Sequence, residues 1–173
     1  MALKTASITL DGDGLRFVGT VGSGHTIILD DAASGTGARP AELVPLALAG
    51  CTAMDVISIL RKKRQDVRGY RVEATGTQMD DHPNAFTRMD VTHVIEGISL
   101  DPAAVARAIE LSATRYCAVG TTLATGMVEI HNGYRIIDSE TGAVIAAEVL
   151  VEGPHAPIGG APSLGTTRSA PAA

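Results

Sequence analysis

Three short β-rich runs open the chain, and turn-type strings separate them. The runs are KTASITL, LRFVGTV and TIILD, with DGDG at residues 11–14 and GSGH at residues 22–25 between them. Glycine combined with aspartate or serine between apolar runs is typical of tight turns. The pattern predicts an antiparallel three-stranded meander over residues 3–30.

The most apolar segment of the chain predicts a long helix that begins near Arg39. Pro40 suits the first helical position, and the basic run Arg61–Arg64 suits the last turn, where the helix dipole favours cations. About 25 residues at 1.5 Å each give a rod of roughly 37 Å. Pro45 is expected to bend this rod near its first turn.

Apolar or small residues surround nearly the whole circumference of this helix from Leu43 to Leu60. A helix of this kind is buried on most sides. One short chain with few aromatic side chains has little with which to cover it, so the pattern predicts a homodimer with this helix near the subunit contact. The longest wholly apolar stretch, residues 43–51, is shorter than a bilayer span, so no membrane partner is expected.

The second half of the chain alternates strands and helices. Strands are predicted over 68–78 and 84–97, with MDDHPN in the turn between them, and a last strand over 127–137. Between them, a helix is predicted to begin with Asp101 as N-cap and Pro102 as first residue. It is expected to pack through Ala103, Ala106, Ile109 (or Ala108) and Ala113. A break near Tyr116 precedes a short helix over 117–124. The order β-β-β-α-β-β-α-α-β predicts an α+β fold.

The composition changes after residue 137. The segment 1–137 is predicted to form one domain, and 138–173 an extension to it. A turn, DSETG, is followed by a predicted extra strand over 143–152 and then by a tail rich in proline, glycine, alanine and serine. Such a composition predicts a flexible tail that folding does not require.

Composition narrows the classes of function. The chain has 173 residues, 45% of them apolar, 3% aromatic and none tryptophan, and its formal net charge is −5. Nucleic-acid binding needs a basic footprint or aromatic stacking faces, so no nucleic-acid partner is expected. The first residues, MALKTASITLDGDG, carry no apolar signal region, which predicts a cytoplasmic location.

Two cysteines, Cys51 and Cys117, stand 66 positions apart. In a reducing cytosol a permanent structural disulfide between them is not expected. No CxxC or HxxxH spacing accompanies them, and the five histidines are scattered singly, so no metal site is expected.

Cys51 lies in the middle of the long predicted helix, among the small residues Ala47, Gly50 and Ala53. A lone buried cysteine usually only packs, but small neighbours leave room beside this sulfur. Asp55 shares its helix face at i+4, where a carboxylate raises the pKa of a thiol, so a cation must be supplied from elsewhere for Cys51 to ionise. Cys117 is predicted near the start of the short helix, where amide donors stabilise a thiolate.

Three stretches resemble the OsmC/Ohr family of osmotically inducible proteins and organic hydroperoxide resistance proteins, and are most similar to its YhfA-like branch. They are RPAELVPLALAGCTAMDVISILRKKRQDV, SGH at 23–25 and ARAIELSATRYCAVGTTL. The likeness covers roughly residues 3–137 in the same element order. It implies an intertwined homodimer in which antiparallel sheets wrap two long central helices, with active sites at the subunit interface.

The resemblance also implies thiol-dependent reduction of organic hydroperoxides by a protein without metal or organic cofactor. In this chain Cys51 is then the peroxidatic residue, which becomes a sulfenic acid, and Cys117 the resolving residue, which forms a disulfide with it. An external dithiol reductant regenerates the two thiols.

The family's activating residues do not map directly. Members of the family carry a carboxylate ten residues before the first cysteine, paired with an arginine, but this position is Ala41 here, with Glu42 next to it. Arg39 and Arg16 are the candidate arginines, and His25 is a further candidate for the pocket. Each has a plainer explanation: Glu42 as a first-turn anion, the arginines as solvated side chains and His25 as a turn residue.

Two other functions stay open from the sequence. One is a non-catalytic homodimer that binds a lipid-like or other small ligand in an apolar pocket beside Cys51, which the acidic Asp55 and the missing carboxylate at 41 favour. The other is a structural dimer in which both cysteines only pack. The distance between the two sulfur atoms distinguishes them from a redox pair, since a disulfide needs Cα atoms within about 7 Å.

Overall fold

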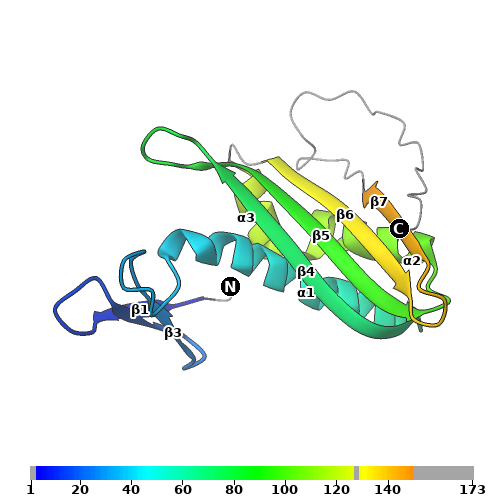
Figure 1. Ribbon diagram of the computed structural model, residues 1–173, viewed down its shortest axis with the longest axis horizontal. Helices are drawn as coiled ribbons and strands as arrows, with labels where there is room; N and C mark the ends of the chain where they lie inside the picture. The colour runs from blue at the N-terminus through cyan, green and yellow to red at the C-terminus, as the bar shows by residue number, and fades with distance from the viewer. Residues whose placement is uncertain (1–2, 127–128, 150–173) are drawn as a thin grey trace. The chain divides into compact units, whose positions relative to one another are not determined.

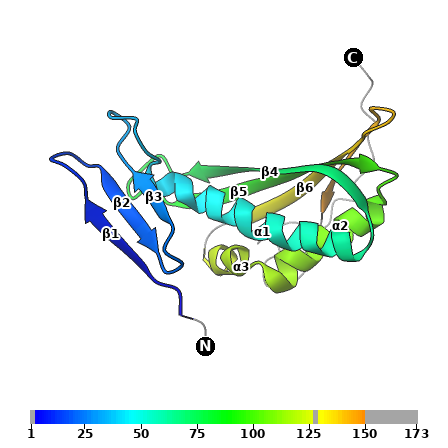
Figure 2. The same ribbon diagram turned by 90° about the horizontal axis from the view of Figure 1, so that it is seen from below.

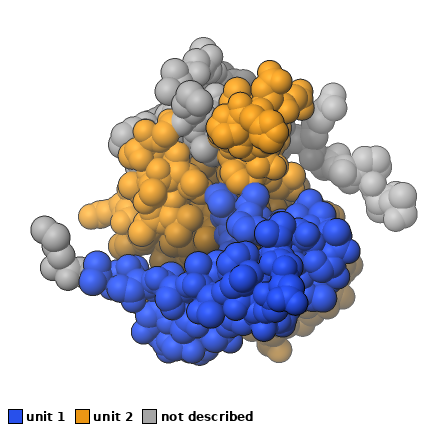
Figure 3. Space-filling model, turned by 90° about the vertical axis from the view of Figure 1, so that its left-hand side faces the viewer, with its two compact units in different colours: residues 1–44 blue, residues 45–173 orange. Residues whose placement is uncertain are grey.

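A computed structural model of the chain describes residues 3–126 and 129–149. The chain divides into two compact units, residues 1–44 and 45–173, which are coloured separately in Figure 3. The predicted tail lies outside the described residues. The predicted boundary at residue 137 remains a prediction.

The first unit contains the predicted meander. Its strands β1 (Ala6–Leu10), β2 (Phe17–Val21) and β3 (Thr26–Leu29) form an antiparallel sheet in the order β1-β2-β3. The turns carry glycines with positive φ at Gly12 and Gly24, a conformation that glycine adopts without strain. The turn strings therefore predicted this sheet correctly.

A 3₁₀ turn, η1 (Pro40–Glu42), leads into the long helix α1 (Leu43–Lys62). Pro40 occupies the first helical position, as predicted, and Arg39 is the N-cap. Glu42 accepts hydrogen bonds from the backbone N–H and the guanidinium of Arg39. Arg61 and Lys62 occupy the last turn, where they complement the helix dipole.

The second unit contains a four-stranded sheet in the order β4-β5-β6-β7, formed by β4 (Asp66–Gln78), β5 (Phe86–Ile98), β6 (Glu129–Asp138) and β7 (Val144–Val149). The pairs β4–β5 and β6–β7 are antiparallel, whereas β5 and β6 run parallel, so this sheet is mixed rather than purely antiparallel. β7 corresponds to the predicted extra strand.

The connection from β5 to β6 carries the remaining helices, because parallel neighbours need a crossover. It consists of α2 (Pro102–Leu111), the π-helical turn η2 (Ser112–Tyr116) and α3 (Ala118–Ala124). The Asp101 side chain caps α2 by accepting from the Ala103 N–H at 2.9 Å, as predicted. Figures 1 and 2 show α1, α2 and α3 together on one face of the sheet.

One stripe of α1 enters the core at four-residue intervals: Leu48, Thr52, Val56 and Leu60 are all buried. Val56 and Leu60 pack in one cluster with Ile95 of β5, Ile109 of α2 and Ile136 of β6. Complete burial of an aliphatic side chain contributes about 1.5–3 kcal/mol. This packing holds α1 and the crossover helices on the sheet.

The packing face of α2 differs in part from the predicted one. Ala103 is exposed and Ala106 is only half-buried, whereas Ala104, Val105, Ala108 and Ile109 are buried. The two larger side chains, Val105 and Ile109, decide which face packs. Burying valine or isoleucine removes more apolar surface from water than burying alanine, and so stabilises the fold more. The predicted stripe was therefore right at Ile109 and Ala108 and wrong at Ala103.

The opposite face of α1 stays largely uncovered. Leu46 is 61% exposed and Met54 is 75% exposed, with exposed Gly50 between them at four-residue spacing. The segment Pro40–Lys62 is also long and apolar enough, by length and composition alone, to cross a membrane. The length of the uninterrupted apolar run at 43–51 therefore does not decide whether this helix enters a membrane. Length and composition do not decide it either, because core helices of globular proteins are often as long and as apolar.

Half-buried Tyr70 and fully buried His93 form a pair on the neighbouring strands β4 and β5. The Tyr70 hydroxyl and His93 Nδ1 are 2.7 Å apart, and the two rings are stacked. His93 Nε2 is buried and has no hydrogen-bond partner among the described residues. Burial lowers the pKa of His93 from 6.5 to about 4, because the charged imidazolium is costly away from water.

We predict that this histidine makes the fold sensitive to acid. The unfolded chain binds the proton near pH 6.5 and the folded chain only near pH 4. The contribution of neutral His93 to the free energy of unfolding is therefore complete above pH 6.5. It is lost as the pH falls from 6.5 to 4, by at most about 3 kcal/mol. The test is denaturant unfolding at pH 7, 5.5 and 4.5. Between pH 7 and 4.5 the free energy of unfolding should fall less in His93→Asn, which keeps an acceptor for Tyr70, than in the wild type.

His82→Asn is the matched control, because His82 is exposed in the β4–β5 hairpin. It should keep the pH dependence of the wild type. Equal losses of unfolding free energy in the wild type and in His93→Asn would contradict the prediction.

Candidate functional site

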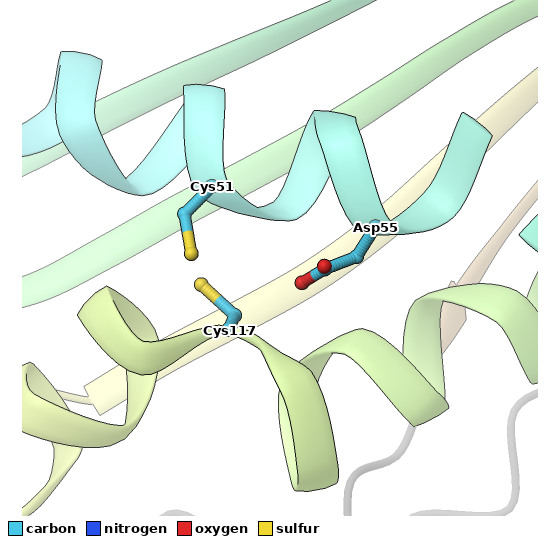
Figure 4. Close-up of side chains that lie close together, drawn as sticks. All are labelled: Cys51, Asp55 and Cys117. Carbon is cyan, nitrogen blue, oxygen red and sulfur yellow. The ribbon is translucent and has the colours of Figure 1, made fainter. Parts of the chain in front are cut away.

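The two cysteines are brought together in the second unit. Cys51 lies in the middle of α1, and Cys117 lies at the break between η2 and α3. Both are free thiols, Cys51 half-buried and Cys117 2% exposed. Figure 4 shows the two sulfur atoms pointing toward each other from facing elements.

Asp55 completes this cluster. The two sulfur atoms and a carboxylate oxygen of Asp55 all lie within 4.8 Å of one another. Asp55 follows Cys51 by four residues on the same helix, so the two side chains project from one face of α1, as the sequence predicted. The 66-residue gap in sequence is closed by the crossover that carries Cys117.

Cys117 is the N-cap of α3, and its sulfur accepts a hydrogen bond from the Gly120 N–H at 3.2 Å. The sequence predicted such an amide donor. Burial nevertheless raises the pKa of the Cys117 thiol to about 12, and the neighbouring Cys51 and Asp55 act in the same direction. The thiol of Cys117 is therefore protonated at neutral pH, because one amide donor does not offset these effects.

Asp55 is held by a buried hydroxyl pair. Ser112 Oγ lies 3.0 Å from Asp55 Oδ2 and 3.0 Å from Thr52 Oγ1. Since a carboxylate can only accept and a hydroxyl has one hydrogen, Ser112 donates to Asp55 and accepts from Thr52. Sequence reasoning did not find Ser112, because nothing in the run SATRY marks a residue that faces α1.

A pocket adjoins Cys117 on the side of the sheet. Its enclosed space is only about 20 Å³, within a hollow of about 380 Å³ that opens to solvent. Its walls are mostly apolar and come from α1, the crossover and β6, with Leu48, Thr52, Ala113, Cys117, Ile130 and Asn132 among them. The space is smaller than an ordinary ligand pocket, and its apolar walls favour an apolar group over a polar one. Cys51, beside which the sequence predicted a pocket, does not line it.

Of the candidate activating residues, Asp55 belongs to the second unit and the other four belong to the first. Arg39 pairs with Glu42 at 2.8 Å, and Arg16 pairs with Asp11. His25 is exposed, and its Nδ1 lies 3.0 Å from the hydroxyl of Ser23. The structure thus groups Cys51, Asp55 and Cys117, while the part that Arg16, Arg39, Glu42 and His25 play at the cysteines remains a prediction.

Comparisons with known proteins agree on one family. The family model described as "OsmC-like protein" matches residues 33–131. The chain is 39% identical over 125 residues to Protein YhfA of Escherichia coli, covering 72% of this chain and 92% of that one.

Solved structures show the same fold. A hypothetical protein from Aquifex aeolicus is 23% identical with a TM-score of 0.70, covering 81% of this chain and all of that one. The organic hydroperoxide resistance protein OhrB of Bacillus subtilis is 19% identical with a TM-score of 0.52, covering 75% and 97%.

We predict that Ser112→Ala destabilises the fold by about 1–3 kcal/mol, because it leaves the half-buried carboxylate of Asp55 without its donor. Chemical denaturation at neutral pH measures this free energy. Ser139→Ala, at an exposed turn position, is the control and should change stability by no more than about 0.5 kcal/mol. Equal unfolding free energies for the two variants would show that the hydroxyl does not support Asp55.

Proposed function

The chain belongs to the OsmC-like protein family, and from this premise we propose that it reduces organic hydroperoxides with Cys51 and Cys117. The observation that carries the proposal is the approach of the two sulfur atoms to within 4.8 Å, from positions 66 residues apart. A pair of thiols that only packed would not need to meet. A role in resistance to peroxides also agrees with the fold shared with organic hydroperoxide resistance proteins.

Cys51 is the peroxidatic residue in this proposal. It is the more exposed of the two, and a substrate needs access to the attacking sulfur. The Cys51 thiolate attacks one peroxide oxygen, the O–O bond breaks, and the alkoxide leaves and takes up a proton to become the alcohol. Cys51 is thereby oxidised to the sulfenic acid.

Cys117 then resolves the sulfenic acid. Its sulfur attacks the sulfur of Cys51, the S–O bond breaks, and water leaves as the disulfide forms. An external dithiol reduces this disulfide by thiol–disulfide exchange and restores both thiols. No metal or organic cofactor takes part in these steps, because sulfur carries the electrons throughout.

The Cys51 thiolate requires a cation, because Asp55 lies beside it. We assign this role to Arg39. Its pairing with Glu42 supports the choice, since an arginine–carboxylate pair is what the family resemblance implies, with the carboxylate displaced by one residue. Arg16 is the alternative, but its partner Asp11 stands in no comparable sequence context.

The pocket beside Cys117 supports an organic substrate over hydrogen peroxide. Its walls are mostly apolar, and apolar walls stabilise an alkyl or aryl group when water leaves both surfaces. The reducing cytoplasm is the location that we propose, since the cycle starts from two free thiols.

A second function follows if the thiols do not turn over. Asp55 beside both sulfurs and the raised pKa of Cys117 oppose thiolate formation, and these observations favour a non-catalytic homodimer that holds a lipid-like ligand in the same pocket. Reaction with peroxide distinguishes the two functions.

We predict that one equivalent of cumene hydroperoxide converts both thiols of the reduced protein into an intramolecular disulfide. Cys117→Ser should accumulate a sulfenic acid at Cys51 that dimedone traps. Cys51→Ser should react at roughly one thousandth of the wild-type rate or below, because the nucleophile is gone. Thiol titration and intact mass spectrometry measure all three proteins.

Hydrogen peroxide is the comparison substrate and should react more slowly than cumene hydroperoxide. If the wild type and both variants consumed cumene hydroperoxide at the same slow rate, the peroxidase proposal would fail and the ligand-binding function would stand.

We further propose that the protein is a homodimer and that the stripe Leu46–Gly50–Met54 of α1 lies at the subunit contact. Two apolar side chains on this stripe are more than half exposed in the single chain. Gly50 has no atom within 4 Å of where a Cβ would stand, so the stripe is open for a neighbouring helix to approach closely. Family resemblance implies the same central position for this helix.

Met54→Glu is expected to weaken the dimer at least a hundredfold, because an unpaired carboxylate at a buried contact costs about 3 kcal/mol or more. Sedimentation at micromolar concentrations measures the dissociation. Met79→Glu, in the β4–β5 hairpin, is the matched control and should remain dimeric. A folded wild-type monomer at these concentrations would refute the proposed assembly.

A further inference from the structure

The cluster Cys51–Asp55–Cys117 offers a metal ion three ligands of suitable chemistry. The sequence excluded a metal site because two cysteines without CxxC or HxxxH spacing are too few. The fold adds a carboxylate to them, and the three donor atoms lie within 4.8 Å of one another. We propose that the reduced protein binds a thiophilic divalent cation such as Zn²⁺ through the two sulfurs and Asp55, with the fourth position open to water or a small ligand.

The spacing of the donors fits a tetrahedral ion. Zn–S bonds of about 2.3 Å and Zn–O bonds of about 2.0 Å place neighbouring ligand atoms roughly 3.5–3.8 Å apart. Each pair of donors therefore needs to close in by about 1.3 Å at most, which side-chain rotation supplies. Cys51 and Asp55 come from adjacent turns of one rigid helix, and Cys117 comes from the facing break, as Figure 4 shows.

Hydrogen-bond donors already face two of the ligand atoms. The Gly120 N–H points at the Cys117 sulfur at 3.2 Å, and the Ser112 hydroxyl donates to Asp55 Oδ2 at 3.0 Å. Both contacts favour the deprotonated ligands, and the second leaves the other carboxylate oxygen for the metal. Donors of this kind orient metal ligands and tune the affinity of a site.

The ligand set also selects the metal. Two thiolates favour zinc, and exclude magnesium and calcium, which prefer oxygen ligands. Cys51 and Asp55 are both half-buried, so an ion can enter from their side without unfolding the helix. Binding releases the thiol protons to solvent, because only the thiolate is a ligand.

This proposal uses the residues of the proposed peroxidase but not its chemistry. If the protein binds metal through all three side chains but its thiols do not react with cumene hydroperoxide, the metal-site proposal stands and the peroxidase proposal fails. A peroxidase without metal affinity would give the reverse result.

Co²⁺ titration of the reduced, metal-free full-length protein is the test, since Co²⁺ replaces zinc and reports its own coordination. The expected spectrum has a thiolate-to-cobalt charge-transfer band and the intense visible bands of a tetrahedral ion, and stoichiometric Zn²⁺ should displace both. Cys51→Ser, Cys117→Ser and Asp55→Asn should each weaken binding at least about tenfold. Circular dichroism confirms that each variant is folded.

Asp80→Asn, at an exposed position of the β4–β5 hairpin, is the matched control and should bind like the wild type. The protein with both cysteines in a disulfide should not bind. The proposal is overturned if the charge-transfer band is missing from the wild type, or if folded Asp55→Asn binds Co²⁺ as tightly as the wild type does.

Discussion

The burial of one stripe of α1 against the β4–β7 sheet fixes where the chemical groups of the second unit lie. Val56 and Leu60 are fully buried in the same cluster as residues of α2, β5 and β6. With that stripe fixed, the helical repeat of 3.6 residues turns Cys51 and Asp55 toward the crossover and leaves Leu46 and Met54 on the outside. The position of the Cys51 sulfur and the uncovered apolar surface thus both follow from the burial of this stripe.

The sequence predicted the order of the elements because their signals are local. Glycine turns mark the meander, Pro40 and Asp101 mark two helix starts, and the change of composition after residue 137 precedes β7. Cys51, Asp55 and Cys117 also stood out as candidates. What local signals could not give is the pairing of β5 with β6, which is parallel and depends on where the crossover returns.

The same limit explains the errors and omissions. Alanine fits a buried or an exposed position equally well, so the alanine-rich run of α2 did not reveal which face packs. Ser112 becomes a partner of Asp55 only when α1 and η2 meet across 57 residues of sequence. The approach of Asp55 to Cys117, on which the proposed metal site depends, could not be predicted for the same reason, because the two residues have no recognisable spacing in the sequence.

The π-helical turn Ser112–Tyr116 adds one residue to the crossover compared with an α-helical turn. A π turn contains one residue more than an α turn, so it rotates everything that follows by about 100° around the helix axis. Cys117 is the first residue after this turn. The orientation of the second sulfur therefore depends on the number of residues before it, and a single-residue deletion within α2 would turn Cys117 away from Cys51 while every side chain of the site remained in the sequence.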